Sequence, residues 1–500
     1  MKPTSALFRF SFYLSRACFG ICLFTLPFYS FADREDRRIQ LNQSVESRKQ
    51  QQEHNIVGSE NIAYGSASSE GEDIFMSLMQ AVNAQDEAET ARLLAVYQQQ
   101  PDYDPDMVIF VKANQAVFRN DMKEAVALYR QVYERNPGFV RGKLDLARLL
   151  FIDKQNREAA ALFSDISVPE VPEINRKITV FKDALANREA WHGSVSLGAG
   201  YETNLNRSSE STVWREQTLC GFGSDGQPIL DSNGELSCRT EKLPAYSPNA
   251  VDGKVWIYET AANKRISLKG HHGIQLNAFA LGRLYPNHAE YSEHNTGLNP
   301  TYSFTNKNNT FTIGPLWQHN WEGGRLQSSN MGISTSFNRE VSPNAFLGIQ
   351  AEHKYDRYRG QNLRHFNGPQ TLLFANGVYA LPNNWTIFGG YDYLRKNSRE
   401  AVDSYRRHGV RFGINKHFGS GIDTTLHTIW RRTAYQDYHA WLETRRKDRE
   451  RIYQLDVKFN RPSLRGFTPI FSFKHTDNRS SSWVNRYKRN EFVFKTEYSF

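Results

Sequence analysis

The sequence predicts an α-helical repeat array followed by a transmembrane antiparallel β-barrel of about 14 strands. Three observations predict this fold class. Small and aromatic residues repeat with a period of 34 positions between residues 73 and 190. Strand-like segments with alternating apolar and polar side chains then run from 191 to 500. The chain ends on an aromatic strand, Phe492–Phe500, which is typical of bacterial outer-membrane barrels.

The amino terminus predicts secretion. A basic stretch precedes an apolar run, Ala17–Tyr29, and Ser30–Ala32 offers small residues for cleavage after Ala32. We therefore expect residues 1–32 to be a signal peptide. Its three basic residues are Lys2, Arg9 and Arg16, so the formal charge falls from +9 to 9 − 3 = +6 on cleavage. That balance is too mild to indicate a nucleic-acid partner.

Residues 33–72 are polar and rich in Gln and Ser, which predicts a disordered periplasmic segment. Two cysteines remain after cleavage, Cys220 and Cys238, both in a stretch rich in Gly, Asp and Ser. In an oxidising compartment they are expected to form a disulfide. A metal site would need further His or Cys ligands nearby, which the sequence lacks, and we expect neither a metal nor a cofactor.

Residues 73–190 predict a periplasmic domain of tetratricopeptide type. Four residues recur 34 positions later with the same chemical character, and Pro137 stands where the first copy ends. The pairs are Ala113 and Ala147, Ala125 and Ala159, Tyr129 and Phe163, and Val132 and Ile166. An ordinary stack of helical hairpins is the alternative, since alanines permit close packing in either case.

Repeat arrays of this kind are more often recognition surfaces than catalysts. The repeat frame puts Asn114, Arg141 and Arg148 on the first helix of each pair, which faces the concave side of such arrays. These three residues are candidate contacts for a client protein. The alternative is that they belong to the solvated surface.

Residues 191–500 predict the barrel. Tyr453, Leu455, Val457 and Phe459 share one face of a strand, whereas Gln454, Asp456, Lys458 and Asn460 share the other. Such alternation suits a strand with one face in lipid and one in a polar lumen. A secreted chain without a long apolar helix can cross a membrane only as a closed barrel.

Short and long connections alternate along this region. Tight turns are expected near residues 269–273, 306–309, 342–344, 382–384, 419–421 and 461–466. Longer polar links are expected at 220–238, 286–291, 322–329, 357–369, 396–401, 435–448 and 477–486. Short periplasmic turns and long external loops are the rule for outer-membrane barrels, so both ends of the barrel and the helical repeats should lie in the periplasm.

An even-numbered barrel must pair its last strand with its first to remove the sheet edges. We expect the strand Gly193–Asn206 to pair with Phe492–Phe500, with Phe492, Phe494, Tyr498 and Phe500 at the closure. If the wall opens to pass a client, this seam is where we expect the opening.

No motif for catalysis stands out. The string Gly221–Gly226 fits a GxGxxG pattern but lies inside the cysteine loop, where a flexible external loop is expected. Asp231–Gly234 resembles part of a calcium loop without its bidentate Glu, so turn chemistry is expected. The adjacent His271 and His272 occupy a tight turn and are expected to be solvated. No HExxH or GxSxG motif is present, and the chain is not expected to be an enzyme.

Three segments resemble motifs of the Slam family, the surface lipoprotein assembly modulators. Gly200–Asn206 reads G-Y-E-T-N-L-N and is similar to the opening of that family's barrel. Tyr391–Ser398 and Lys474–Ser481 resemble its polar strand ends with Asn and Ser. The resemblance implies a periplasmic repeat domain, a barrel of 14 strands, and delivery of client proteins across the outer membrane. Clients of that family are surface lipoproteins or secreted proteins, often ones that capture host nutrients.

The partners that follow are a client protein, outer-membrane lipids, the barrel-assembly machinery and periplasmic chaperones. Two other functions remain open. Repeats fused to a barrel also occur in exporters of exopolysaccharide, which would need a ladder of aromatic residues and charge of one sign along the lumen. A plain diffusion porin would leave the repeat domain without a role.

Overall fold

The computed structural model describes residues 37–38, 74–168, 171–220, 227, 229–461 and 465–500. The expected signal peptide lies outside the described residues, as does the expected disordered segment apart from Arg37 and Arg38, so both stay predictions. No helix in the described part of the chain is both long and apolar enough to cross a membrane.

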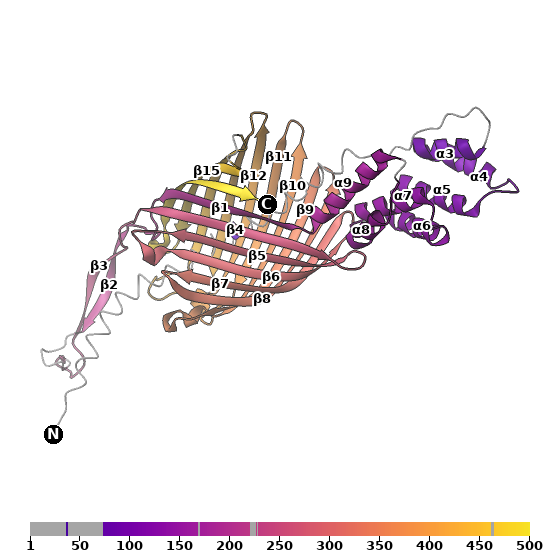
Figure 1. The fold of residues 1–500 in the computed structure, drawn as a ribbon. Coiled ribbons are helices and arrows are strands. Elements are labelled where there is room, and N and C mark those ends of the chain that lie inside the picture. The colour runs from indigo at the N-terminus through magenta and orange to yellow at the C-terminus, as the bar shows by residue number, and fades with distance from the viewer. Residues whose placement is uncertain (1–36, 39–73, 169–170, 221–226, 228, 462–464) are drawn as a thin grey trace, which may run out of the picture.

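The amino-terminal domain is a helical array at one end of the molecule (Figure 1). Its helices are α3 (Ile74–Ala84), α4 (Glu87–Tyr97), α5 (Pro105–Phe118), α6 (Met122–Arg135), α7 (Val140–Ile152), α8 (Asn156–Ser164) and α9 (Pro172–Arg188). Gln85, Asn120 and Lys154 end the first helix of each pair with positive φ angles of 57°, 60° and 62°. Asp86 and Asp121 then cap α4 and α6 by accepting backbone N–H bonds. The pairs are therefore α3–α4, α5–α6 and α7–α8, as the tetratricopeptide period predicts.

The repeated residues form the core of this array. Ala113, Ala125, Ala147 and Ala159 are all 0% exposed. The missing side-chain bulk lets paired helices approach closely, and aromatic rings fill the space beside them. Phe110 and Tyr129 meet edge to face at 5.7 Å, whereas Phe163 and Phe181 stack at 5.1 Å.

The carboxy-terminal domain is a closed antiparallel barrel in which β1 pairs with both β4 and β16. Its first seven strands are β1 (Trp191–Glu202), β4 (Gly253–Ser267), β5 (His272–Leu284), β6 (Glu293–Thr305), β7 (Asn309–Glu322), β8 (Arg325–Ser342) and β9 (Ala345–Tyr358). The other seven are β10 (Gly368–Leu381), β11 (Trp385–Lys396), β12 (Tyr405–Phe418), β13 (Ile422–Tyr435), β14 (Lys447–Phe459), β15 (Phe467–Ser480) and β16 (Tyr487–Ser499).

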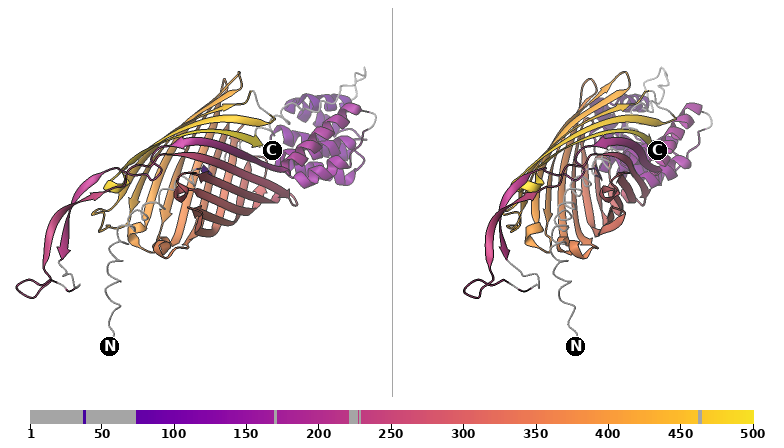
Figure 2. Two further views of the ribbon diagram at one scale, coloured as in Figure 1. Left: turned by 60° about the vertical axis from the view of Figure 1, so that its left-hand side comes forward. Right: turned by 90° about the vertical axis from the view of Figure 1, so that its left-hand side faces the viewer.

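The two ends of the barrel differ. Five of the six expected short turns lie at the end that carries the helical array and residue Phe500, which we name the short-turn end (Figures 1 and 2). The sixth, 461–466, falls partly outside the described residues. At the opposite, long-loop end the links include the 3-10 turns η1 (Ala289–Tyr291), η2 (Gln361–Phe366), η3 (Ala401–Asp403) and η4 (Trp483–Asn485). A hairpin of β2 (Thr212–Cys220) and β3 (Cys238–Tyr246) projects from this end outside the barrel sheet.

One expected long link is wrong. The strands β7 and β8 continue to Glu322 and from Arg325, so the connection is only Gly323–Gly324 rather than residues 322–329. Both glycines have positive φ angles, 55° and 74°, which side chains disfavour and which a tight hairpin turn requires. Leu326, Ser328 and Ser329 have partners in the β7–β8 ladder, and Gln327 lies at a register shift within it, so these residues belong to the strand instead of a loop.

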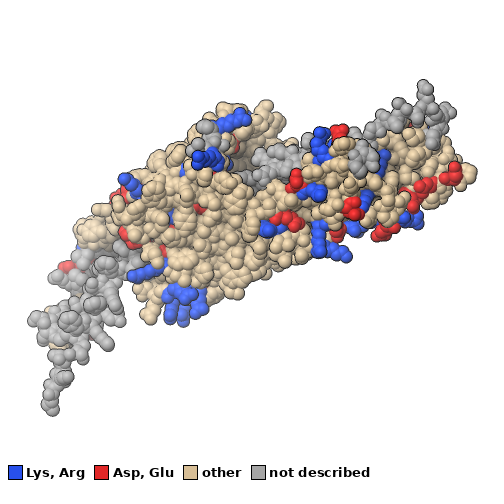
Figure 3. All heavy atoms as spheres, viewed as in Figure 1, with Lys and Arg blue, Asp and Glu red and all other residues tan. Residues whose placement is uncertain are grey.

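The barrel wall has an apolar outer face and a polar inner face. Outward side chains such as Val410, Phe412 and Leu426 are at least half exposed, and Figure 3 shows few charges over the middle of the β4–β8 side. Inward side chains are polar and buried, as with Asp392, whose carboxylate lies 3.0 Å from Arg411 and 3.5 Å from Arg407. Outward apolar residues and inward polar ones are the pattern of a transmembrane barrel.

The ladder between β6 and β7 is interrupted within the wall. Between β6 and β7 the register skips from Leu298 opposite Trp317 to Tyr302 opposite Ile313. Pro300 and Pro315 lie in this gap and lack the N–H groups that a ladder needs. The Asn299 side-chain amide donates to the Pro315 carbonyl at 2.6 Å and replaces part of the lost pairing.

Barrel closure predicts a strong effect of adding bulk at Gly200 in β1. A Cβ atom there would lie 2.2 Å from the carbonyl oxygen of Phe492 in β16, which is backbone and can move only if the strands separate. We expect Gly200→Val to prevent a closed barrel, seen as loss of the fast-migrating folded band in unheated electrophoresis. The control is Ala199→Val, an outward and exposed position on the same strand. Normal folding of Gly200→Val would contradict the close approach.

Candidate functional site

The first candidate site is the seam between β1 and β16. Ser194–Glu202 pairs with Glu491–Ser499, and Gly193 and Phe500 exchange backbone hydrogen bonds of 2.9 and 3.1 Å. The expected strand is too long at its far end, because β1 stops at Glu202 and Asn204 has a left-handed φ of 53°. Asn206 therefore lies beyond the closure, where its side-chain amide donates to the Asn249 carbonyl at 2.7 Å.

The aromatic residues of β16 lie on the outer side of the seam. Phe492 is 44% exposed and Phe494 is 55% exposed, and both point away from the lumen. Phe500 packs over Gly193, where an added Cβ would lie 2.7 Å from the Phe500 ring. These aromatic side chains belong to the outer, lipid-facing surface, while pairing of the two strands rests on backbone hydrogen bonds.

The inner face of β1 carries almost no side-chain bulk. Ser194, Ser196, Gly198 and Gly200 are its successive inward residues. Within the part of the chain that the structure describes, the hydroxyl groups of Ser194 and Ser196 are buried and make no hydrogen bond. Side chains therefore contribute little to holding β1 from within.

A salt bridge crosses over this bare strand. Lys495 on β16 reaches past β1 to Glu259 on β4, with 2.6 Å between Nζ and Oε2. Gly198 permits this path, because a Cβ there would lie 2.5 Å from the Cβ of Lys495. The neighbours of β1 are thus joined to each other across its inner face.

A buried charge cluster closes the long-loop end of the seam. Glu202 on β1 is 0% exposed and accepts from Arg283, Arg489 and the Tyr285 hydroxyl. Arg283 also reaches Glu491 on β16 at 2.7 Å. Burying a carboxylate costs free energy unless it is paired and hydrogen-bonded, and Glu202 has both kinds of partner.

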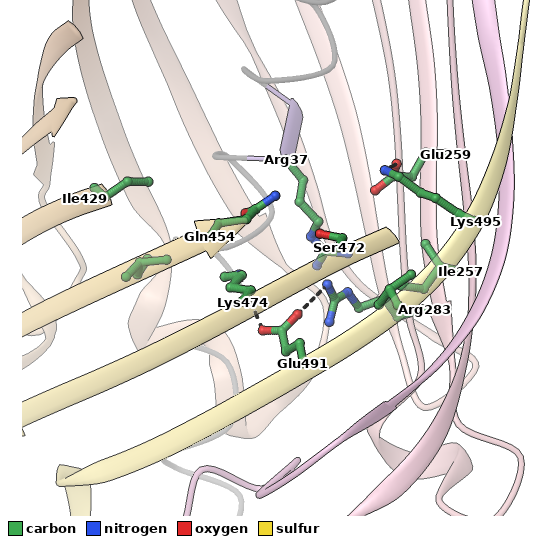
Figure 4. A pocket seen from close by; sticks show the side chains of 12 residues that line it. Arg37, Ile257, Glu259, Arg283, Ile429, Gln454, Ser472, Lys474, Glu491 and Lys495 are labelled. Carbon is green, nitrogen blue, oxygen red and sulfur yellow. Dashed lines mark hydrogen bonds and ion pairs between the residues drawn. The ribbon is translucent and has the colours of Figure 1, made fainter. Parts of the chain in front are cut away.

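A small cavity of about 70 Å³ lies beside this cluster in the lumen (Figure 4). Its charged lining mixes signs: Arg37, Arg283, Lys474 and Lys495 against Glu259 and Glu491. Its apolar lining is aliphatic: Ile257, Ile429, Ile452 and Val493. The dashed contacts in Figure 4 join Glu491 to Lys474 and to Arg283, so Glu491 is held from two strands.

Two arginines inside the barrel, Arg37 and Arg38, are not among the residues that the sequence predicts for a site. Arg38 donates to both carboxylate oxygens of Glu352 at 2.7 and 2.8 Å, and Arg37 donates to Glu293 at 3.2 Å. Both arginines come from the stretch that was expected to be disordered, and both lie inside the barrel. Two adjacent cations in a Gln-rich stretch were the available signal, but their acidic partners lie more than 250 positions away.

The second candidate site is the face formed by α3, α5 and α7. The structure brings Arg141 and Asn114 together around Phe110: the Arg141 guanidinium lies 5.2 Å from the ring centre, and the Asn114 amide donates to the Phe110 carbonyl at 2.9 Å. Arg141 also donates to Asn83 on α3 at 2.6 Å. Arg148 lies on the same helix as Arg141, two turns further on. No contact with a client tests these three residues, and their role stays a prediction.

Asp145 lies between the two arginines and is 7% exposed. Burial raises the pKa of its carboxyl group, while the charges of Arg148 and Arg141 and a hydrogen bond from Tyr129 act in the opposite direction without offsetting burial. The charged form of Asp145 therefore depends on Arg141 and Arg148 for its stability.

The helical array docks on the short turns of the barrel. His271 in the β4–β5 turn contacts Asp153 at 2.8 Å, and the Gly270 N–H donates to Glu158 at 3.2 Å. Lys307 in the β6–β7 turn donates to Asn120 at 2.6 Å. His271 is thus part of the interface between the two domains, and the expectation that it is solvated is wrong.

The disulfide and the loop motifs lie at the opposite end. Cys220 and Cys238 are joined at the tip of the β2–β3 ladder. Asp231 accepts from the backbone N–H groups of Asn233 and Glu235, which is turn chemistry. The string Gly221–Gly226 lies outside the described residues. Among the described residues no three His, Cys, Asp or Glu side chains are grouped as metal ligands would be.

Two sequence families match the chain. Residues 191–500 match the family described as surface lipoprotein assembly modifier. Residues 68–163 match the family described as surface lipoprotein assembly modifier, N-terminal TPR repeats. The two matches fall on the barrel and on the helical array respectively.

Individual relatives cover most of the chain. The hemophilin secretion modulator of Acinetobacter baumannii is 29% identical over 96% of this chain and 99% of its own length. Surface lipoprotein assembly modifier 1 of Neisseria meningitidis is 22% identical over 80% of this chain and 77% of its own length. Among solved structures, a FadL homologue of Pseudomonas aeruginosa matches 63% of this chain and 91% of its own length at 8% identity, with a TM-score of 0.36.

Asp145 gives a prediction with a definite sign. Its pKa is raised on folding, so the folded state holds more protons than the unfolded state just above pH 3.8, and stability falls as the pH rises through that window. An asparagine cannot lose a proton, so Asp145→Asn removes this pH-dependent loss of stability. We therefore expect the unfolding temperature of the helices to rise at neutral pH and to stay unchanged at acid pH. A change of about 1 kcal/mol moves the midpoint of a small domain by several degrees.

The measurement is circular dichroism at the helical minimum during heating of the full chain in detergent. Asp183→Asn on α9 is the matched control, because its carboxylate is exposed. Equal destabilisation of Asp145→Asn at every pH would show that the carboxylate is needed as an ion-pair partner instead.

Proposed function

Because the chain belongs to the surface lipoprotein assembly modifier family, we propose that it recognises particular client proteins in the periplasm and promotes their delivery across the outer membrane. The barrel is an outer-membrane barrel, and its short-turn end is the periplasmic one. The helical array then lies in the periplasm.

One observation carries the proposal: a recognition surface and a polar lumen are joined end to end in one molecule. The contacts of Asp153, Glu158 and Asn120 hold the array against the periplasmic turns. Helix pairs present a concave face suited to an extended segment of a client. A client bound there is held at the mouth of the barrel.

The class of client follows from the relatives. Most are named for surface lipoproteins, and the Acinetobacter baumannii relative is named for hemophilin secretion. We propose a client from one of these two classes, a surface lipoprotein or a secreted protein that binds a host nutrient. The barrel-assembly machinery would insert the chain, and periplasmic chaperones would keep a client partly unfolded.

The lumen supports protein delivery over the two alternatives. The cavity beside the seam has mixed charges and aliphatic side chains, whereas a polysaccharide path would need aromatic side chains on which sugars stack. The salt bridges inside the lumen at Glu202, Glu259 and Glu352 oppose a simple open diffusion pore. A porin would also leave the docked helical array without a role.

We further propose that the route involves the seam of β1 and β16. The bare inner face of β1 leaves its edge held by backbone hydrogen bonds and by ion pairs that proteins or water can replace. Parting of these strands would open the lumen sideways, toward the lipid.

The first test deletes the chain from cells that express it together with the products of neighbouring genes. We expect a client to lose its surface display, measured by protease shaving of intact cells, and to regain it on complementation. Complementation with Arg141→Glu should restore display only in part, since the substitution reverses charge beside Phe110, whereas Arg92→Glu on the exposed side of α4 should restore it fully. Undiminished display in the deletion strain would refute the proposal. Binding of the array to a polymer and to no envelope protein would favour polysaccharide export.

The second test locks the seam. Ser194 pairs with Ser499 across the seam and with Ala261 on the other side of β1, so Ser194→Cys can be combined with either Ser499→Cys or Ala261→Cys. Opposite residues of antiparallel strands lie about 4.5–5.5 Å apart between Cα atoms, within the range of a disulfide. We expect the seam lock to abolish most client display, a reductant to restore it, and the β1–β4 lock to have little effect.

Equal display with the seam locked would count against this route and leave the delivery role intact. The interrupted ladder at Pro300 and Pro315 would then be the next place to lock.

A further inference from the structure

Six arginines lie on the outward face of strands β11–β15, all near the long-loop end of the barrel. They are Arg395, Arg406, Arg432, Arg449, Arg451 and Arg479, which we name the arginine patch, and all six are exposed. Successive side chains of a strand alternate between its two faces. Each arginine is an even number of positions from an outward apolar residue of its own strand, as Arg406 is from Val410 and Arg432 from Trp430.

The strand register places several of these arginines directly opposite one another. Arg395 lies opposite Arg406, Arg432 lies opposite Arg449, and Arg449 also lies opposite Arg479. Residues directly opposite each other in a sheet have Cβ atoms about 5 Å apart, and like charges there destabilise the pairing. Three such pairs on one face of one wall form a row of positive charge that an anion would stabilise.

The chain itself supplies little negative charge to this row. Arg479 lies 3.4 Å from Asp477, and Arg395 donates to the side chain of Asn397 at 3.1 Å. Arg451 lies directly opposite Asp477 in the β14–β15 ladder, whereas Arg406, Arg432 and Arg449 have no ion-pair partner within the described residues. The matching anion must therefore come from outside the described chain.

The other side of the barrel lacks such a row. At the same end of β4–β9, the outward positions hold mostly aromatic or neutral residues: Trp256, Leu284, His294, Trp321 and Tyr355. Its outward cations are isolated, since Arg357 lies opposite Ser329. The row of outward arginines is therefore confined to strands β11–β15 and does not continue around the whole rim of the barrel.

The position of the patch identifies the anion. On the same outward face, Val410 and Phe412 lie on the periplasmic side of Arg406, and Tyr453 lies on the periplasmic side of Arg451. The arginines thus border the apolar band of the wall at its external edge, where lipid headgroups lie. Guanidinium groups bind phosphate through two parallel hydrogen bonds and are less strongly hydrated than ammonium groups.

The geometry points to a binding site for phosphorylated lipid headgroups of the outer leaflet on the arginine patch. Neighbouring arginines of adjacent strands share one phosphate, which neutralises the like charges that the strand register places together. The site lies on the wall that leads to β16, whereas β1, β4 and β5 have no equivalent, so the two sides of the seam differ in their lipid contacts. The site does not depend on the proposed function.

The experiment measures lipid binding to the purified full chain in detergent by native mass spectrometry. The probe is synthetic lipid A with two phosphates, and its comparison is the same lipid without phosphates. We expect the phosphorylated lipid to bind, and the triple variant Arg406→Gln, Arg432→Gln, Arg449→Gln to bind it at least about tenfold more weakly because charge-assisted contacts are lost. Arg357→Gln, an outward arginine at the same end of β9, should bind as the unaltered chain does.

Lysine variants and competing ligands test whether the lipid phosphates are what the patch binds. Replacing the same three arginines by lysine should keep most of the binding, and unheated electrophoresis checks that each variant is a closed barrel. Equal binding of the lipid without phosphates would overturn the site, as would full competition by millimolar inorganic phosphate, which would make it a site for free anions. Tighter binding of an acidic peptide than of the lipid would overturn it in favour of a protein partner.

Discussion

The structure depends on one constraint: inside a bilayer, every backbone N–H and C=O group of the wall must find its partner within the chain. The fourteen barrel strands meet this constraint only if β16 returns to β1, which places residues almost 300 positions apart in one ladder. An even number of strands then brings both ends of the barrel to the same side. The helical array, which precedes β1, must therefore stand at the short-turn end, next to Phe500.

The interior follows from the same closure. Inward side chains are removed from lipid and largely from water, so charges there need partners, and the barrel supplies them from several strands at once, as Glu202 and Asp392 show. Ion pairs of this kind add little net stability, because desolvation offsets their attraction. Their contribution is to specify which strands meet. At β1 the Lys495–Glu259 pair passes over the middle of the strand, and the strand's own ion pairs gather at Glu202 near its long-loop end.

Much of this architecture could be predicted from local patterns. Alternation indicated the two faces of the strands, the alanine period indicated the helix pairs, and polar stretches located five of the seven long links, while a sixth, 220–238, lies partly outside the described residues. The seventh was wrong because the mostly polar segment Arg325–Ser329 is compatible with a loop and also with a strand, and only the turn at Gly323–Gly324 distinguishes the two. The candidate residues for client contact could be predicted from the repeat frame, but not their partners within the chain, since Asn83 is 58 positions away from Arg141, to which it is hydrogen-bonded.

The sequence by itself determined the fold class, the faces of most strands, the order of the domains and the membrane to which the chain belongs. Each of these follows from residue patterns that are no longer than one repeat or one hairpin. Only the tertiary structure decided which charges are paired, that His271 is an interface residue, that Arg37 and Arg38 enter the lumen, and that six arginines form one surface. Those facts depend on the register of neighbouring strands and on contacts between distant segments, and the physical reason is that closure and docking, rather than local propensity, bring such residues within bonding distance.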